Sequence, residues 1–172
     1  MKKFIAIFFC VFLIAGIFLY QGLKPNYHTE YLRIHIRANS NSYIDQNIKY
    51  KIKDNIVEYL TPLISSCNTK KEFECVISKN LANIECIANE ILAQNTLDYQ
   101  SRAELKNEYF PARSYENLTL EEGNYDALIL SLGSGEGDNW WCVVYPPLCF
   151  INSSKYSYKS RLVEIIQNFF GG

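Results

Sequence analysis

This sequence has few histidines, almost no net charge and no paired cysteine motif. The chain has 2 histidines, and 17 Lys and Arg residues against 18 Asp and Glu residues give a net charge of -1. So little net charge creates no long-range field that would favour nucleic acid or an anionic surface as the partner. The sequence contains no C-x-x-C pair, no internal repeat and no low-complexity tract. We therefore expect no metal site of the usual cysteine spacing, and no cofactor.

The remaining composition is that of one folded domain. The 172 residues are 48% hydrophobic, which is enough to bury a substantial core. Tyrosine and phenylalanine are abundant, with 13 and 10 copies. Aromatic side chains serve both cores and interfaces, and we expect most of them to lie in the core.

The N-terminus carries a topogenic signal. Lys2 and Lys3 precede an apolar run over residues 4–20. A run of this length is at the short end of a membrane span, about 17 to 25 residues, and exceeds the usual signal-peptide core of about 7 to 15. This favours an uncleaved anchor, with the rest of the chain outside the cytoplasmic membrane. We expect an anchor or signal segment over residues 1–23, a linker over 24–30 and a single extracytoplasmic domain over 31–172.

Hydrophobic periodicity predicts an α+β domain. Its mixed, partly antiparallel sheet should have about four strands and pack with two long helices and a short C-terminal helix. Both orientations of the first strand relative to the others are compatible with the sequence. The predicted elements are, in order, a strand over 31–37, a helix from 42 to about 60, a longer helix from about 69 to 93, a strand over 97–109, strands over 126–132 and 140–145, and a helix over 161–170.

Two of these elements have a predicted solvent face. In the first strand, Arg33, His35 and Arg37 alternate with apolar residues, which indicates a wet, basic face. In the first helix, an apolar stripe should face the core, Pro62 should close the helix, and three lysines should face outward. The stripe is formed by Ile44, Ile48, Ile52, Ile56 and Leu60, and the lysines are Lys49, Lys51 and Lys53.

The stretch from Gly133 to Cys149 is the most unusual part of the chain. It joins two predicted strands through a short segment that contains Gly135 and Gly137, a composition suited to a hairpin loop. A phosphate-binding loop would instead open a helix. Pro146 and Pro147 should end the second strand.

Cys142 and Cys149 enclose those two prolines, and two interpretations of this pair are open. They can form a disulfide, which an extracytoplasmic address permits, or remain two independently buried thiols. A third interpretation makes the protein a thiol-dependent hydrolase, with Cys142 as nucleophile, His35 as base and Asn39 or Asn139 as orienting amide. We regard this enzyme as the alternative function.

Three blocks of the sequence resemble the stage II sporulation protein R family. The resemblance covers roughly residues 30–152, and the last block is the most specific. The chain departs from the family at Glu121 and Glu122, where proline and alanine are expected, and at Tyr145, where phenylalanine is expected. The blocks are A-N-S-N-S at 38–42 with Asp45, Gln46 and Lys49; Y-F-P at 109–111; and G-x-G-x-G-x-N-W-W-C-V-V-Y-P-P-L-C at 133–149.

The resemblance implies a sporulation signalling protein of endospore-forming bacteria, and no enzyme. Such a protein is exported from the forespore into the intermembrane space facing the mother cell, and residues 4–20 would attach it to the membrane if they are not cleaved. Its implied partner is a membrane-embedded aspartic protease, stage II sporulation protein GA. Once activated, that protease processes the precursor of sigma factor E in the mother cell.

We expect one surface of the domain to bind the protease. Loops at strand ends commonly carry function on a rigid scaffold, and the two most distinctive blocks both supply such loops. Trp140 and Trp141 point to opposite faces of their strand, so at most one should anchor the contact. The predicted contact residues are Asn39, Ser40, Asp45, Gln46, Gly133, Gly135, Gly137, Asn139, Trp140, Trp141, Pro146 and Pro147.

Overall fold

The computed structural model describes residue 12 and residues 30–115, 118–150 and 159–170. Apart from Phe12, the predicted apolar run over residues 4–20 lies outside these residues, as does the linker apart from Glu30. Within the described ranges, no helix is long and apolar enough to cross a membrane.

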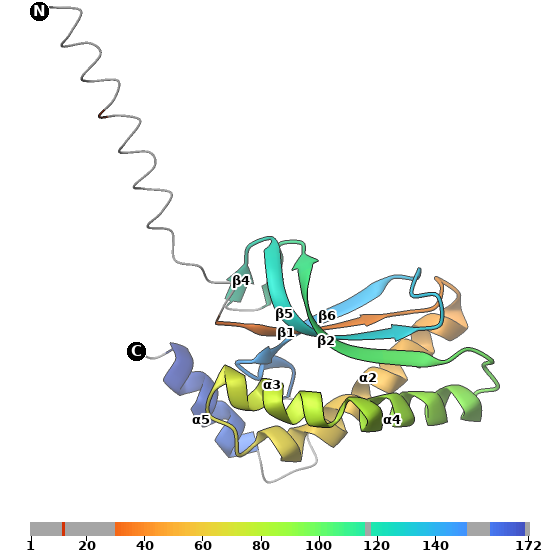
Figure 1. The fold of residues 1–172 in the computed structure, drawn as a ribbon, viewed down its shortest axis with the longest axis horizontal. Coiled ribbons are helices and arrows are strands. Elements are labelled where there is room, and N and C mark those ends of the chain that lie inside the picture. Colours follow the sequence, from red (N-terminus) through yellow and green to blue (C-terminus); the bar gives the residue numbers. More distant parts are fainter. Residues whose placement is uncertain (1–11, 13–29, 116–117, 151–158, 171–172) are drawn as a thin grey trace, which may run out of the picture.

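The elements confirm an α+β domain with a mixed sheet of four strands (Figure 1). A second sheet holds two short strands, β3 and β4. The bounds are β1 Leu32–Arg37, α2 Tyr43–Ile64, α3 Lys70–Lys79, α4 Leu81–Gln94, β2 Ser101–Phe110, β3 Arg113–Tyr115, β4 Leu118–Leu120, β5 Gly123–Leu132, β6 Asn139–Tyr145, a 3-10 turn η2 Leu148–Phe150, and α5 Lys159–Phe170.

The strand order of the main sheet is β2-β5-β1-β6. β1 is parallel to β5 and antiparallel to β6, while β2 is antiparallel to β5. The predicted hairpin between the last two strands is therefore wrong, because β1 lies between them. This arrangement lets the backbone groups of β1, which is almost completely buried, pair on both sides.

Helices α2, α3 and α4 lie along one face of the sheet (Figure 1). The predicted stripe of α2 is buried from Ile48 onward, while Ile44 is 59% exposed. The helix continues past Pro62 to Ile64. Proline is tolerated there because it removes a single backbone donor, close to the helix end.

The second predicted helix is two helices, so α2 is the longest element. The break lies at Asn80, whose side chain donates to the Val76 carbonyl at 2.7 Å and accepts from the Tyr59 hydroxyl at 2.6 Å. A side chain that bonds the backbone one turn earlier competes with the helical ladder. This contact with α2 fixes where α3 ends and α4 begins.

The other face of the sheet is not the wet face that the alternation predicts. Arg33 and His35 are both buried. The β2–β5 pair curls away from the helices at one end (Figure 1), and Phe110 and Tyr125 from this end form a second small core together with Val143 of β6. Because the sheet folds over itself, both faces of β1 are buried. The polar–apolar alternation of its sequence therefore separates two buried environments and not a core face from a solvent face.

Candidate functional site

The loop over residues 133–138 crosses the end of β1 and lies on the turn over residues 38–42. We call these two segments, together with Asp45 and Gln46 of α2, the junction. Backbone and side-chain groups of both segments bond directly. The hydrogen bonds run from Gly137 N to Ala38 O (2.9 Å), Ser134 N to Asn39 Oδ1 (3.0 Å), Ser134 Oγ to Asn39 O (2.7 Å) and Asp138 N to Asn41 Oδ1 (2.6 Å).

Glycine is required at both ends of this loop. Gly133 has a φ of +56°, and a Cβ there would lie 2.3 Å from Asn39 Oδ1. At Gly137, a Cβ would lie 2.2 Å from the backbone oxygen of Ser40. The loop approaches the turn too closely for any side chain, which explains the glycine spacing without a phosphate ligand.

The carboxylate of Asp45 holds the turn over residues 38–42 in place. Its carboxylate accepts hydrogen bonds from Asn39 Nδ2 (3.0 Å), Ser40 Oγ (2.6 Å) and the Tyr99 hydroxyl (2.6 Å). Burial alone would raise the pKa of Asp45, but these bonds outweigh it and hold the pKa below its usual value. Burial and the same carboxylate raise the pKa of Tyr99. The cluster is a charged, fully bonded anchor for the turn.

Lys49 holds the loop from the helix side. Only 1% of this residue is exposed, and its Nζ donates to the backbone oxygen of Asp138 at 2.7 Å and to Gln46 Oε1 at 2.6 Å. Gln46 Nε2 in turn donates to Ser40 O at 2.9 Å. The prediction that Lys49 faces solvent is wrong, because the loop covers it; burial lowers its pKa.

Sequence reasoning also left Lys49 and Tyr99 out of the predicted contact residues. Lys49 could have been included, because it lies four residues after Asp45 and residues four apart share a helix face. Tyr99 precedes β2 and lies 54 positions from Asp45, and no local pattern connects the two.

An exposed apolar patch adjoins the junction. Tyr43 and Tyr50 of α2 are 82% and 47% exposed, and Ile44 lies beside Tyr43. Trp140 packs partly against the helix-side core, and the ammonium group of Lys53 lies 5.7 Å from its ring centroid. Trp141 packs on the opposite face against the second core. The alternation of the two tryptophans is as predicted, and Trp140 is the one on the same face as α2.

The structure does not bring all predicted contact residues together. Asn139 begins β6 beside the loop and is exposed. Pro146 and Pro147 follow the other end of this seven-residue strand, about 20 Å away at strand spacing. There a disulfide joins Cys142 to Cys149, whose Cα atoms are 6.2 Å apart. Cys67, Cys75 and Cys86 are free.

The geometry that a Cys142–His35 hydrolase needs is absent. Cys142 is in the disulfide and packs on the helix face of the sheet. The His35 ring instead contacts Phe110 and Trp141, with centroid distances of 5.7 and 5.3 Å, on the opposite face. In the described part of the chain, no group of three or more His, Cys, Asp or Glu residues could hold a metal ion.

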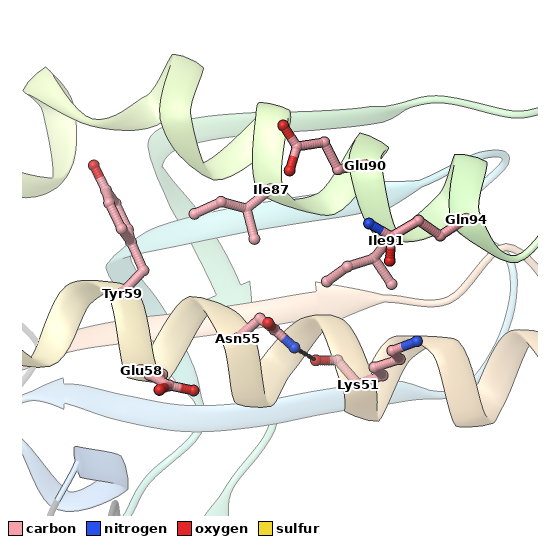
Figure 2. A pocket seen from close by; sticks show the side chains of 8 residues that line it. All are labelled: Lys51, Asn55, Glu58, Tyr59, Ile87, Glu90, Ile91 and Gln94. Atoms are coloured by element: carbon pink, nitrogen blue, oxygen red, sulfur yellow. Dashed lines mark hydrogen bonds between the residues drawn. The ribbon is translucent and has the colours of Figure 1, made fainter. Parts of the chain in front are cut away.

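An open groove of about 330 Å³ lies between α2 and α4, away from the junction (Figure 2). Ile87 and Ile91 of α4 form its apolar side, opposite Tyr59 and Asn55 of α2. Asn55 is already engaged, because its Nδ2 donates to the Lys51 carbonyl at 2.8 Å. The other polar residues that line the groove carry charges of both signs. We therefore do not assign a binding site to the groove. The complete lining is Lys51, Asn55, Glu58, Tyr59, Ile87, Glu90, Ile91 and Gln94.

Comparison with known proteins identifies the family. The model of stage II sporulation protein R (spore_II_R) matches residues 28–155, a range that contains the whole junction. Stage II sporulation protein R of Bacillus subtilis (strain 168) is 34% identical over 123 residues, which are 72% of this chain and 55% of that relative, so the match spans little more than half of the relative. No solved structure matches significantly. The chain belongs to the stage II sporulation protein R family.

Proposed function

We propose that this protein is an exported sporulation signal that activates the membrane-embedded aspartic protease stage II sporulation protein GA. The activated protease processes the precursor of sigma factor E in the mother cell. Family membership is the observation that carries this proposal. In the proposal, the domain acts from the space between the forespore and the mother cell.

The junction is the surface that we propose for the protease. It is rigid, because the loop and the turn are joined by direct hydrogen bonds and are held from below by Asp45 and Lys49. A preorganised surface loses little conformational entropy when it binds. Beside it, the exposed Tyr43 and Tyr50 offer the kind of aromatic side chain that often anchors protein interfaces.

The test is co-expression of the full chain with the protease and the sigma factor E precursor in a host that lacks all three. We expect processed sigma factor E when all three are present. None should form when the chain is omitted, or when the protease carries a substitution of its catalytic aspartate. Unprocessed precursor in the presence of correctly exported, folded chain would contradict the proposal.

A further inference from the structure

The buried polar atoms that lack a hydrogen bond gather in one place. Six such side-chain atoms occur in the described part of the chain, and all six belong to four residues. We call these residues the polar layer. They are Arg33 (Nε and Nη1), His35 (Nδ1 and Nε2), Glu108 (Oε2) and Trp141 (Nε1). Buried polar groups are nearly always bonded, so a cluster of exceptions calls for partners, which water or a ligand can supply.

Short contacts connect these residues into a continuous layer between the sheet and its curled end. The His35 and Trp141 ring centroids are 5.3 Å apart, and His35 Nδ1 lies 3.3 Å from Glu108 Oε1. The Phe110 ring contacts both Arg33 and His35: the Arg33 Cζ lies 4.2 Å from its centroid, and the His35 ring centroid 5.7 Å. The layer is therefore one site and not four separate defects.

The layer has more donors than acceptors. Burial, with Arg37 acting in the same direction and Glu108 against it, lowers the pKa of His35 to about 4, so the ring is neutral at pH 7 and has one N–H donor. The donors without any hydrogen bond or carboxylate neighbour are then Arg33 Nε and Nη1 and the Trp141 indole N–H. His35 Nδ1 lies 3.3 Å from Glu108 Oε1, and Glu108 Oε2 lies 3.4 Å from Lys106 Nζ.

Arg33 takes part in none of the ion pairs between described residues. Its Nη2 donates to the Tyr115 hydroxyl at 2.8 Å, and aromatic rings surround its guanidinium. Glu108, the nearest carboxylate in the layer, is shared between Arg37 and Lys106. A buried cation without a counter-charge is costly, and an anion would offset that cost.

The unbonded donors lie on one face of the sheet, at neighbouring positions. Arg33 faces Val143 across the β1–β6 pair, which makes Trp141 its diagonal neighbour. Long side chains at diagonal positions of adjacent strands are within reach of each other. Guanidinium groups bind planar carboxylates especially well, and Glu108 disfavours an anion of higher charge.

Entry to the layer lies beside Trp141. This indole is partly exposed, and the guanidinium of Arg113 covers it, with Cζ 4.0 Å from the ring centroid. Arg113 belongs to β3, a three-residue strand that pairs with the equally short β4. A ligand that binds beside Trp141 therefore also meets the positive charge of Arg113.

We propose that the polar layer binds a carboxylate group, which enters beside Trp141 and accepts hydrogen bonds from Arg33 and the Trp141 Nε1. A free carboxylic acid and an acidic side chain of a polypeptide would both supply this group. The site does not depend on the proposed protease activation, because it lies on the face of the sheet away from α2.

The test measures the melting temperature of the full chain at pH 7.5 in sodium acetate, sodium chloride and acetamide at equal concentrations. We expect acetate to raise it by about 4 °C at ten times its dissociation constant, and chloride and acetamide to raise it by less than half as much. Trp141→Phe and Arg33→Met should remove the acetate effect. Trp140→Phe, which removes an indole N–H from the opposite face, should retain it.

A second arm distinguishes the sources of the group. End-blocked Gly-Glu-Gly and Gly-Gln-Gly peptides replace acetate: a larger shift with the Glu peptide than with acetate favours a polypeptide, and the reverse favours a free acid. Equal shifts in acetate and chloride mean an adventitious ion only and overturn the proposal. So does the absence of a shift with every carboxylate, which means that water fills the layer. If Arg33→Met does not fold, an unchanged acetate effect in Trp141→Phe overturns it alone.

Discussion

The Nζ of Lys49 lies 2.7 Å from the backbone oxygen of Asp138, so a buried ammonium group of α2 holds the loop that crosses the end of β1. The loop is 89 positions away in the sequence. Together with the four hydrogen bonds between the loop and the turn, this contact joins the two most distinctive blocks of the sequence into one surface. It also makes the geometry of the junction testable by substitution.

Lys49→Met is expected to lower the free energy of unfolding by about 1–3 kcal/mol. The reason is that it removes the Lys49 donor from the Asp138 oxygen and from Gln46 Oε1, two partly buried hydrogen bonds. Urea unfolding followed by circular dichroism measures the change. Lys51→Met is the matched control, because Lys51 is exposed on the same helix and should change stability by less than about 0.5 kcal/mol. Equal effects of the two substitutions would contradict the assigned role of Lys49.

Gly137→Ala should destabilise the protein more than Gly135→Ala. A Cβ at Gly137 meets the Ser40 backbone at 2.2 Å, so the loop must move off the turn, at a cost of about 1–3 kcal/mol or more. At Gly135 the nearest atoms to a Cβ are 3.6 Å away, and only its positive φ of +68° opposes a side chain, at about 1 kcal/mol. Thermal unfolding of both variants gives the order, and the reverse order would refute the close approach at Gly137.

Stability should fall between pH 6.5 and pH 4 because of His35. Burial, reinforced by Arg37, lowers the pKa of the folded residue to about 4, whereas an unfolded histidine has a pKa of about 6.5. In this window the unfolded chain binds a proton that the folded chain does not, so acid favours unfolding. Between pH 7 and pH 4.5, the free energy of unfolding of the wild type should fall by roughly 2–3 kcal/mol more than that of a His35→Gln variant. Parallel pH profiles of the two proteins would show that His35 titrates normally.

Removing the disulfide should cost stability but not the fold. The bridge between Cys142 and Cys149 closes a loop with a sequence separation of 7, and a loop of this size contributes about 2 kcal/mol by restricting the unfolded chain. We expect that loss in the double variant Cys142→Ala, Cys149→Ala, measured by urea unfolding. Cys75→Ala is the control, since this free cysteine is exposed. A double variant as stable as the wild type would show that the bridge does not form.

Short-range sequence patterns predicted most of the helices and strands, but not which strands lie next to each other in the sheet. Ser42 caps α2, with its Oγ accepting from Asp45 N at 3.1 Å, and Thr69 and Glu72 form a capping box at the start of α3. These features depend on residues a few positions apart. The insertion of β1 between β5 and β6 depends on pairing across about 90 to 110 positions, and no local pattern encodes it.

The same reason explains the errors about burial. The sequence predicted that Arg33, His35 and Lys49 face solvent, because they alternate with apolar residues or carry charge. Each is covered by a segment distant in sequence: the curled end of β2 and β5 over the first two, and the glycine loop over Lys49. The 39–46 and 133–138 segments, in contrast, were expected to share a surface. They meet because β1 and β5 are parallel, so both segments follow strand ends at the same edge of the sheet.

The most direct measurement of the central claim is the fraction of sigma factor E precursor processed in the co-expression system with two tyrosine variants. Tyr43 and Tyr109 are both exposed, at 82% and 58%, but Tyr43 adjoins the junction while Tyr109 lies near the end of β2. If the junction surface contacts the protease, Tyr43→Ala should reduce processing at least about tenfold, as expected for a contact worth about 1.4 kcal/mol, and Tyr109→Ala should leave it unchanged. Full processing with a folded Tyr43→Ala protein, or an equal loss with both variants, would contradict the account.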